Sequence, residues 1–145
     1  MKQYIGTKIV QAAPKMRKVT AENCLADRGF EDGYKVIYPD GYESWSPKDV
    51  FEAAYRETSG MNFGLAIEAA KMGKKIARAG WNGKNQYVEL GHDFSYIAPG
   101  GIPVRPVQHL DIGSQALVFV GTRGRQVGWL ASQADMLADD WMIVE

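Results

Sequence analysis

The sequence predicts an α+β fold in which short helices pack on antiparallel sheets. Short runs that alternate between apolar and polar residues are rich in β-branched and aromatic side chains, and turns containing glycine or proline separate them. The helical patterns are also short, and each begins at a capping residue. A polar stretch at residues 57–60 interrupts the pattern, so we expect a small ββα-like module over residues 1–57 and a second domain over residues 61–145.

The first strand is expected at residues 2–10, where Ile5, Thr7 and Ile9 would share one face of an extended chain. Residues 11–33 are polar and weakly patterned, which is typical of a loop with room for a short helix near residues 21–26.

A strand, a turn and a second strand are expected at residues 34–38, 39–41 and 42–45, because proline and glycine supply the turn dihedrals. Ser46 then reads as an N-cap and Pro47 as the first helical residue. The following helix should cover the small sheet with the side chains that share its apolar face: Val50, Phe51, Ala54 and Tyr55.

The second part opens with a helix that Asn62 caps and Gly73 ends. Its apolar positions follow helical spacing: Phe63, Ala66, Ile67 and Ala70. Strands are expected at residues 74–79, 86–90, 117–121, 126–130 and 140–144.

Two features complete this second part. Ser132 and Asp135 have the spacing of a capping box, which predicts a short helix to about Ala138. Residues 91–116 contain three prolines and four glycines, and we expect them to form one long connection. Connections of this length are uncommon and are usually functional or mobile.

The composition excludes several classes of protein. The 17 basic and 17 acidic residues balance, whereas a general binder of DNA or RNA is usually basic. No apolar run approaches the roughly 18 residues of a membrane span, and the N-terminus lacks the apolar stretch of a signal peptide. The single cysteine, Cys24, rules out an internal disulfide, fits a reducing cytosol and reads most simply as an inert small residue.

The most informative motif is the glycine turn at residues 78–84, where Trp81 stands between two glycines with cations on either side. An indole can stack on a nucleobase, and the amide of Asn82 can read a base edge. Arg78 suits phosphate, while Gly80 and Gly83 let backbone N–H groups approach a ligand. A flat, anionic, nucleotide-like ligand fits this combination.

Each of these residues also has a purely structural interpretation. Trp81 would then be a buried anchor beneath its turn, although Trp45 and Trp141, which lie in or beside strand patterns, fit that role better. A ligand contact and a structural role are equally open for Arg78. The remaining cations near the turn read more simply as a solvated helix end: Lys71, Lys74 and Lys75.

Two helix starts add to the candidate site. Trp129 lies close to the helix that begins after Ser132, and Asn62 marks the start of the earlier helix. Free N–H groups at such starts bind anions well. The candidate residues therefore gather at two helix starts and one glycine turn, which only tertiary structure can bring together.

An enzyme is the less favoured interpretation. His92, Asp93, His109 and Asp111 share one connection and offer metal ligands, but solvated loop residues explain them more simply. No nucleophile elbow, Walker sequence or dinucleotide fingerprint is present.

Three blocks of sequence, in order, resemble one known family. The first runs from Asn62-Phe63-Gly64 to Ile67, the second is residues 71–84 with Arg78-Ala79-Gly80-Trp81-Asn82-Gly83-Lys84, and the third is residues 129–141. Together they resemble the phage-encoded anti-Thoeris signal sponges, the second type of Thoeris anti-defence protein. The resemblance covers residues 61–145. Residues 1–57 resemble an extra N-terminal module found on some phage proteins of this kind, and this second resemblance does not suggest an activity for them.

The resemblance implies a protein that is not an enzyme and has no cofactor and no metal site. Such proteins bind a cyclic ADP-ribose isomer made by bacterial Thoeris defence and sequester it in the cytoplasm of the infected host. They assemble as homo-oligomers, typically tetramers, with pockets at subunit interfaces. The resemblance also allows binding of the cyclic dinucleotides of CBASS defence. The balanced charge and the absence of a long apolar run predict no DNA or RNA polymer and no membrane as partner.

Residue chemistry suggests how such a ligand would be held. Trp81 would stack on the adenine, Asn82 or Asn62 would read its edge, and Arg78 would take the pyrophosphate. Ser132 and Asp135 would bind ribose hydroxyls unless capping occupies them. The full candidate set is Asn62, Phe63, Gly64, Arg78, Trp81, Asn82, Gly83, Trp129, Ser132 and Asp135.

Two alternatives remain beside the sponge. One is a metal-dependent phosphodiesterase that degrades a nucleotide signal with the histidines and aspartates of residues 91–116. The other is a phage structural or interaction module in which the glycine turn only packs.

Overall fold

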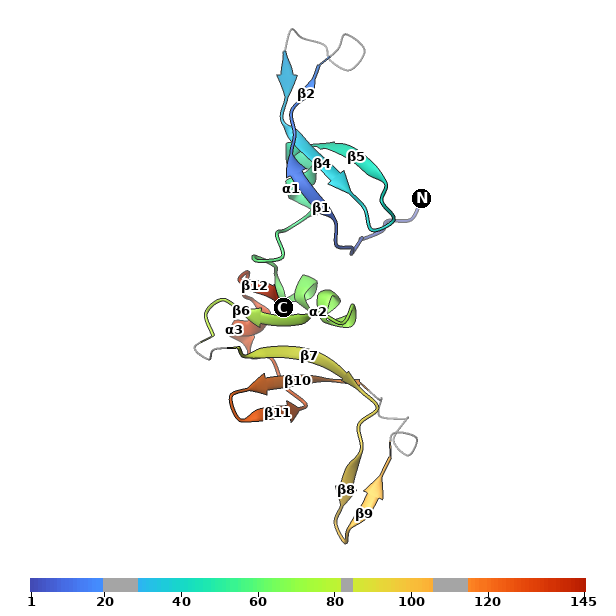
Figure 1. Ribbon diagram of the computed structural model, residues 1–145, viewed down its shortest axis with the longest axis vertical. Coiled ribbons are helices and arrows are strands. Elements are labelled where there is room, and N and C mark those ends of the chain that lie inside the picture. The colour runs from blue at the N-terminus through green and yellow to red at the C-terminus, as the bar shows by residue number, and fades with distance from the viewer. Residues whose placement is uncertain (20–28, 82–84, 106–114) are drawn as a thin grey trace. The chain divides into compact units, whose positions relative to one another are not determined.

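The computed structural model describes residues 1–19, 29–81, 85–105 and 115–145, and it divides into two compact units, Met1–Arg56 and Glu57–Glu145. In the described residues the first unit contains antiparallel sheets and one short helix, and the second contains antiparallel sheets and two, which confirms the α+β class (Figure 1). No helix in the described part of the chain combines the length and the apolar character that crossing a membrane requires. The short helix expected near residues 21–26 lies outside the described residues.

The first unit is built on a three-stranded antiparallel sheet in the order β1 (Gln11–Pro14), β4 (Gly33–Ile37), β5 (Glu43–Pro47). A shorter pair, β2 (Arg17–Lys18) and β3 (Phe30–Glu31), is also antiparallel. The prediction of a strand at residues 2–10 is wrong. Gln11 pairs with Ile37, the last residue of β4, so the chain before Gln11 has run past the end of its neighbour.

The hairpin between β4 and β5 confirms the predicted strand, turn and strand. The Tyr38 N–H donates to the Tyr42 carbonyl at 2.9 Å, and the Gly41 N–H donates to the Tyr38 carbonyl at 2.9 Å. Gly41 has φ +86°, a conformation that glycine adopts without a steric penalty.

Helix α1 (Lys48–Ala54) begins later than predicted, because β5 continues to Pro47, which pairs with Gly33. Pro47 is therefore the N-cap, and Ser46 does not cap the helix. The helix contacts β4 through Phe51, whose ring stacks on Tyr34 at 4.4 Å and on Tyr55 at 4.8 Å. Val50 and Ala54, which were expected on the packing face, are exposed.

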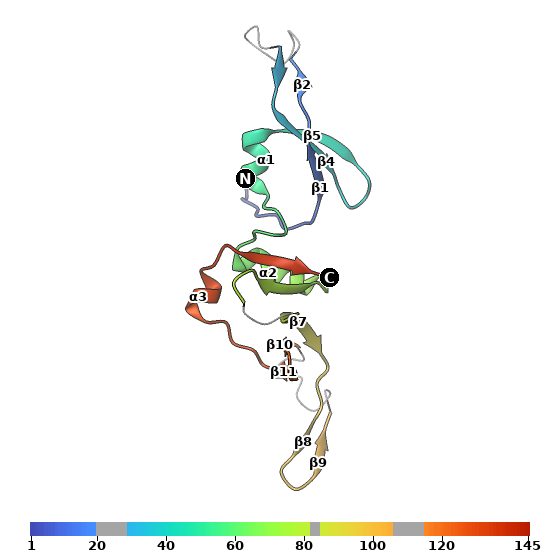
Figure 2. The same cartoon turned by 60° about the vertical axis from the view of Figure 1, so that its left-hand side comes forward.

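The second unit contains a five-stranded antiparallel sheet (Figure 2) in the order β11, β10, β7, β6, β12. These strands are β6 (Lys75–Arg78), β7 (Tyr87–His92), β10 (Gln115–Gly121), β11 (Gly124–Val127) and β12 (Trp141–Val144). Helix α2 (Phe63–Lys71) contacts β6, β7 and β12. Its C-cap is Met72, directly before Gly73, which has φ +84°, as the sequence predicts.

The core of this unit lies between α2 and the sheet. The alanines on the buried face of α2 let the helix approach the strands closely, and Trp141 is fully buried beneath it. The buried members of the core are Met61, Ala66, Ala69, Ala70, Ile76, Val88 and Trp141.

The outer edge of β12 pairs with the segment that precedes α2. Met61 and Trp141 exchange two backbone hydrogen bonds, of 2.8 and 3.0 Å, and the Ile143 N–H donates to the Thr58 carbonyl at 2.8 Å. The polar stretch at residues 57–60, which separates the two predicted domains, is therefore hydrogen-bonded to the sheet through Thr58.

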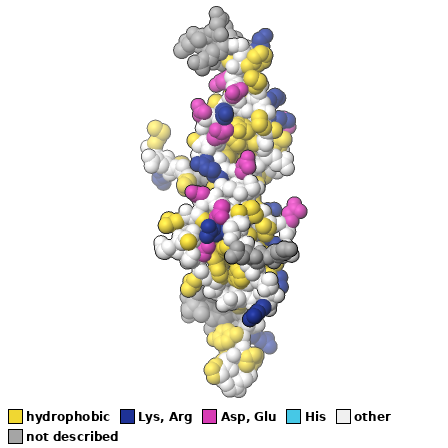
Figure 3. All heavy atoms as spheres, turned by 90° about the vertical axis from the view of Figure 1, so that its left-hand side faces the viewer, with side chains coloured by type: hydrophobic (Ala, Val, Ile, Leu, Met, Phe, Trp, Pro, Cys, Tyr) yellow, Lys and Arg dark blue, Asp and Glu magenta, His cyan; other side chains and the backbone are white. Residues whose placement is uncertain are grey.

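The prediction of one long connection at residues 91–116 is wrong. This stretch contains a hairpin of β8 (Tyr96–Ala98) and β9 (Ile102–Val104), which Gly100 and Gly101 close with φ values of +89° and +81°. Because prolines and glycines are typical of loops, the sequence prediction missed these two short apolar strands. Hydrophobic side chains of this hairpin are exposed at the lower end of Figure 3.

The last segments differ from the sequence predictions only in their ends. Strand β11 stops at Val127 rather than at residue 130, because Gly128 has φ +86° and turns the chain. Helix α3 (Gln133–Met136) is two residues shorter than predicted, and its capping box is confirmed.

Candidate ligand-binding site

Four aromatic side chains meet in the second unit, and we call them the aromatic cluster: Trp81, Phe119, Trp129 and Trp141. The ring centroid of Trp81 lies 5.5 Å from that of Trp141, 5.6 Å from that of Phe119 and 6.0 Å from that of Trp129. All three pairs are edge-to-face, the geometry that ring quadrupoles favour. The fold therefore joins Trp81 and Trp129, which are distant in sequence.

Trp81 has a packing role and also retains accessible surface. Its side chain is partly buried and packs against the core, whereas Trp141 is completely buried. The anchor role that the sequence assigned to Trp141 is confirmed, and its indole N–H donates to the Asp135 carbonyl at 2.8 Å. A ligand that stacked on Trp81 would thus meet a ring whose orientation three neighbours fix.

Arg78 makes two ion pairs next to the aromatic cluster. Its Nε donates to Asp140 Oδ1 at 2.8 Å, and its Nη1 donates to Asp135 Oδ1 at 3.0 Å. The other Asp140 oxygen, Oδ2, accepts from the Gly80 N–H at 3.3 Å. The guanidinium and the two carboxylates therefore connect β6, α3, the start of β12 and the turn that carries Trp81.

These contacts shift the pKa values of all three groups. The hydrogen bonds that Arg78 donates, first to Asp140 and then to Asp135, raise the pKa of Arg78 above its usual value. The hydrogen bond from Arg78 is the main reason why the pKa of Asp140 is lowered. Burial alone would raise the pKa of Asp135, but hydrogen bonds from Ser132 and Arg78 outweigh burial and lower it. All three groups are held in their charged forms.

Ser132 and Asp135 are engaged with each other at the start of α3. Asp135 Oδ2 accepts from the Ser132 N–H at 3.0 Å and from the Ser132 hydroxyl at 2.7 Å. The Asp135 N–H in turn donates to Ser132 Oγ at 3.1 Å. Capping therefore occupies the polar groups that the sequence also suggested for ribose.

The start of α2 lies beside the same cluster. Asn62 Oδ1 accepts from the Leu65 N–H at 2.9 Å, which confirms its role as N-cap. Phe63 packs against Trp141 with ring centroids 5.4 Å apart, while Asn62 and Gly64 are exposed. Through Phe63 the fold joins the first helix start to the aromatic cluster.

The remaining candidates are placed less completely. Asn82, Gly83, His109 and Asp111 lie outside the described residues. His92 is exposed at the end of β7. Within the described ranges no three histidine, cysteine or carboxylate side chains gather as metal ligands would.

Sequence reasoning missed Asp140 and Phe119. Asp140 reaches Arg78 because Trp141 pairs with Arg78 across β12 and β6, and no local pattern reveals that register. Phe119 is one of several apolar residues in β10, and no local pattern shows that its ring meets that of Trp81.

Comparison with known proteins adds independent information. Residues 61–144 match the Thoeris anti-defense 2-like domain. Thoeris anti-defense 2 of Bacillus phage SP01 is 33% identical over 85 residues, which cover 58% of this chain and 94% of that protein. The matched residues include every candidate named above. The chain therefore belongs to the Thoeris anti-defense 2-like family of phage anti-Thoeris proteins.

Proposed function

We propose that the protein binds a cyclic ADP-ribose isomer produced by Thoeris defence and sequesters it without degrading it. Family membership supports the anti-Thoeris role. The observation that carries the binding role is the aromatic cluster, in which partly exposed indoles lie beside an ion-paired arginine and a capped helix start. A ligand with an adenine, two riboses and a pyrophosphate needs these kinds of surface.

The base is assigned to Trp81, with Trp129 as the adjacent wall. Stacking of a base on an aromatic side chain contributes about 1–3 kcal/mol. The edge-to-face contacts fix the Trp81 ring, so little side-chain entropy is lost when a ligand binds. Asn82 and Gly83, which follow Trp81 in the sequence, are proposed to read the adenine edge and to let backbone N–H groups approach.

The pyrophosphate is assigned mainly to backbone N–H groups at the start of α2, around Phe63 and Gly64. Such groups bind anions because they have no partner within the helix and lie at the positive end of its dipole. Arg78 retains N–H donors beyond the two used by Asp135 and Asp140, but these carboxylates already compensate its charge. We therefore propose that Arg78 orients the phosphate rather than attracting it.

Ser132 and Asp135 receive a different role in this proposal. A direct contact with ribose would require the capping box to open, which would leave backbone donors of α3 unpaired. The two residues are instead proposed to hold α3 and Arg78 in place. Ribose hydroxyls would then meet backbone groups and the side-chain N–H groups of Asn62, whose Oδ1 caps α2.

An effective sponge binds its ligand at nanomolar levels, equivalent to about 12 kcal/mol. One stacked base and one phosphate contact fall short of this, so an enclosed pocket is needed. We propose that a homo-oligomer, a tetramer, forms the pocket at its subunit interfaces. Leu130 and Leu137, which flank α3 near the cluster, are 90% and 78% exposed and offer apolar surface to a neighbouring subunit.

The same pocket is proposed to accept cyclic dinucleotides of CBASS defence as a second ligand class, since these also present a purine and phosphates. The site of action is proposed to be the cytoplasm of the infected host, where both signals are produced. Residues 1–57 lie outside the matched family domain, so no part of the nucleotide site is assigned to them.

The test is to mix the full chain with the cyclic ADP-ribose isomer, denature the complex and identify the released small molecule. Recovery of intact ligand, together with saturable binding before denaturation, supports sequestration. A cleaved product would identify an enzyme, and addition of a chelator would then test the metal-dependent phosphodiesterase alternative. Absence of any binding, and of any rise in melting temperature with ligand, would leave a structural or interaction module.

A further inference from the structure

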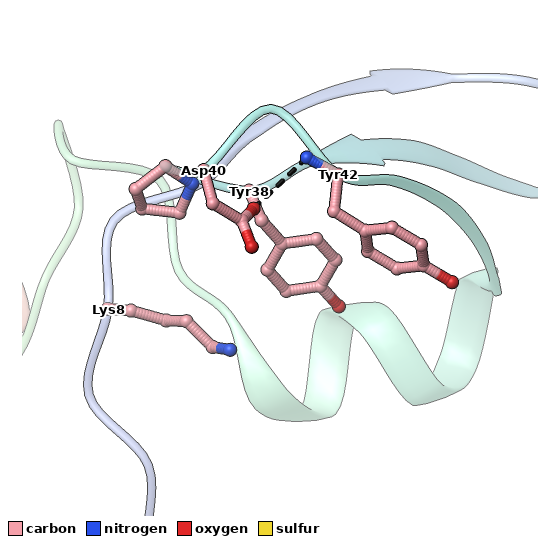
Figure 4. A pocket seen from close by; sticks show the side chains of 5 residues that line it. Lys8, Tyr38, Asp40 and Tyr42 are labelled. Atoms are coloured by element: carbon pink, nitrogen blue, oxygen red, sulfur yellow. Dashed lines mark hydrogen bonds between the residues drawn. The ribbon is translucent and has the colours of Figure 1, made fainter.

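A shallow groove in the first unit faces the residues that precede β1. Lys8, Tyr38, Pro39, Asp40 and Tyr42 line it, and its volume is about 510 Å³ (Figure 4). The rings of Tyr38 and Tyr42 are tilted by 34° with centroids 5.8 Å apart, and together with Pro39 they give the groove an apolar wall. Tyr42 is 64% exposed, so nothing in the described residues fills the groove.

Two charged side chains, Asp40 and Lys8, lie at the rim of the groove. Asp40 uses Oδ1 to accept the Tyr42 N–H at 3.0 Å, and its side chain is exposed. Lys8 places its Nζ 4.5 Å from the centroid of the Tyr38 ring, a cation–π contact. This contact attaches the N-terminal segment to the groove at Lys8.

The segment before Lys8, residues 2–7, is what we call the arm. It lies before the first strand, and among the described residues it makes no backbone hydrogen bond. Its apolar side chains are almost fully exposed, with Tyr4 at 89% and Ile5 at 96%. Yet the alternation of Ile5, Thr7 and Ile9 is that of a segment which pairs or packs in an extended form.

We infer that the arm of one subunit binds in the groove of a second copy of this chain, and that the exchange is reciprocal. Tyr4 and Ile5 of each arm pack on Tyr38, Pro39 and Tyr42 of the partner, and Lys2 lies near the partner's Asp40. This inference concerns the first unit only and does not depend on the nucleotide-binding role of the second unit.

Three observations favour a second copy as the occupant. First, the two complementary surfaces, an apolar arm with an added cation and an apolar groove with an exposed carboxylate, are present in the same unit. Second, Lys8 attaches the arm at the groove, but Tyr4 and Ile5 are exposed and so do not fill their own groove. Third, two such arms can satisfy both grooves around one twofold axis, which gives a closed dimer rather than an open chain of subunits.

The length of the arm suits this exchange. Three or four residue steps separate Lys8 from Ile5 and Tyr4, and an extended chain spans about 10–14 Å over that distance. The two grooves therefore have to lie within roughly that distance of each other across the dimer axis.

Disulfide trapping in the full chain tests the inference. In a Cys24→Ser background, one chain carries Ile5→Cys and a second, size-tagged chain carries Tyr42→Cys; the two are mixed and oxidised mildly. We expect a disulfide that joins the two differently sized chains. The matched control replaces Tyr42→Cys with Thr122→Cys, an exposed position in the second unit, and should give at least tenfold less of the joined product.

Two outcomes would overturn the inference. The first is joined product no more abundant than with the Thr122→Cys control. The second outcome concerns a chain that carries both Ile5→Cys and Tyr42→Cys. If its disulfide forms only within one chain on dilution, the arm fills its own groove and not that of a second copy. Sedimentation of the Ile5→Ser variant gives a separate readout. We expect association through this contact to be at least tenfold weaker, and unchanged association would contradict the exchange. Failure of ligand binding by the second unit would not affect either result.

Discussion

Replacing Trp81 with leucine tests whether the aromatic cluster both stabilises the second unit and binds the ligand. Leucine keeps an apolar side chain but removes three edge-to-face ring pairs. Each pair contributes about 0.5–1.5 kcal/mol beyond its buried area, so the free energy of unfolding should fall by about 1.5–4.5 kcal/mol. The loss of one stacked base should weaken ligand binding by a further 1–3 kcal/mol, or about 5- to 150-fold.

Two assays separate these effects. Denaturant unfolding of the ligand-free protein gives the change in stability, and calorimetry with the cyclic ADP-ribose isomer, at a temperature where the variant is folded, gives the change in affinity. Trp81→Phe should recover part of both quantities, because it keeps a ring. Trp45→Leu is the matched control, since Trp45 belongs to the first unit and its replacement should leave ligand affinity unchanged.

The results can refute the reasoning in two ways. If Trp81→Leu lowers stability but changes affinity less than twofold, Trp81 only packs and is not a wall of the binding site. If neither quantity changes, the edge-to-face contacts do not stabilise the unit, and the proposed site loses its main support.

Three further predictions concern the frame around the site. Folding lowers the pKa values of Asp135 and Asp140, so the stability that these carboxylates provide is present above their unfolded pKa near 3.8 and is lost as the pH falls through their folded pKa values. Melting temperatures measured from pH 6 to pH 2.5 should show this loss of stability in acid. Asp140→Asn should make the melting temperature depend less on pH. Asn62→Ala removes the cap of α2 and should lower the free energy of unfolding by about 0.5–2 kcal/mol, whereas Asn62→Asp should restore most of it. Gly73→Ala places a side chain at φ +84° and should cost about 1 kcal/mol in a denaturant titration, and an unchanged or higher stability would contradict the assigned helix end.

Local signals in the sequence predicted local structure well. The cap of α2 at Asn62 and the capping box at Ser132 depend on residues only three positions apart, so sequence spacing reveals them. The turn at Gly41 and the helix end at Gly73 are visible for the same reason, because each needs a residue that tolerates positive φ.

Features that depend on partners distant in sequence were harder to predict. The pattern at residues 2–10 has the alternation of a strand, but β4 ends before it could supply a partner. The sequence left a ligand role for Arg78 equally open with a structural one, because nothing nearby indicates that β12 would bring Asp140 to it. Tyr96 and Ile102 lie in a run rich in proline and glycine. Their pairing with Val104 and Ala98 in the β8–β9 hairpin could likewise not be predicted from the sequence.

The hydrogen bonds between Thr58, Met61 and β12 have a practical meaning for anyone who wishes to produce the family domain alone. Sequence similarity begins at residue 61, but the backbone that protects the outermost strand begins earlier. A fragment that begins at residue 61 would keep the Met61–Trp141 pair but would lose the Thr58 carbonyl that accepts from the Ile143 N–H. This would open part of the edge of β12 to pairing with other chains. Expression should therefore start at Glu57, where the natural sequence already supplies the residues that shield this strand.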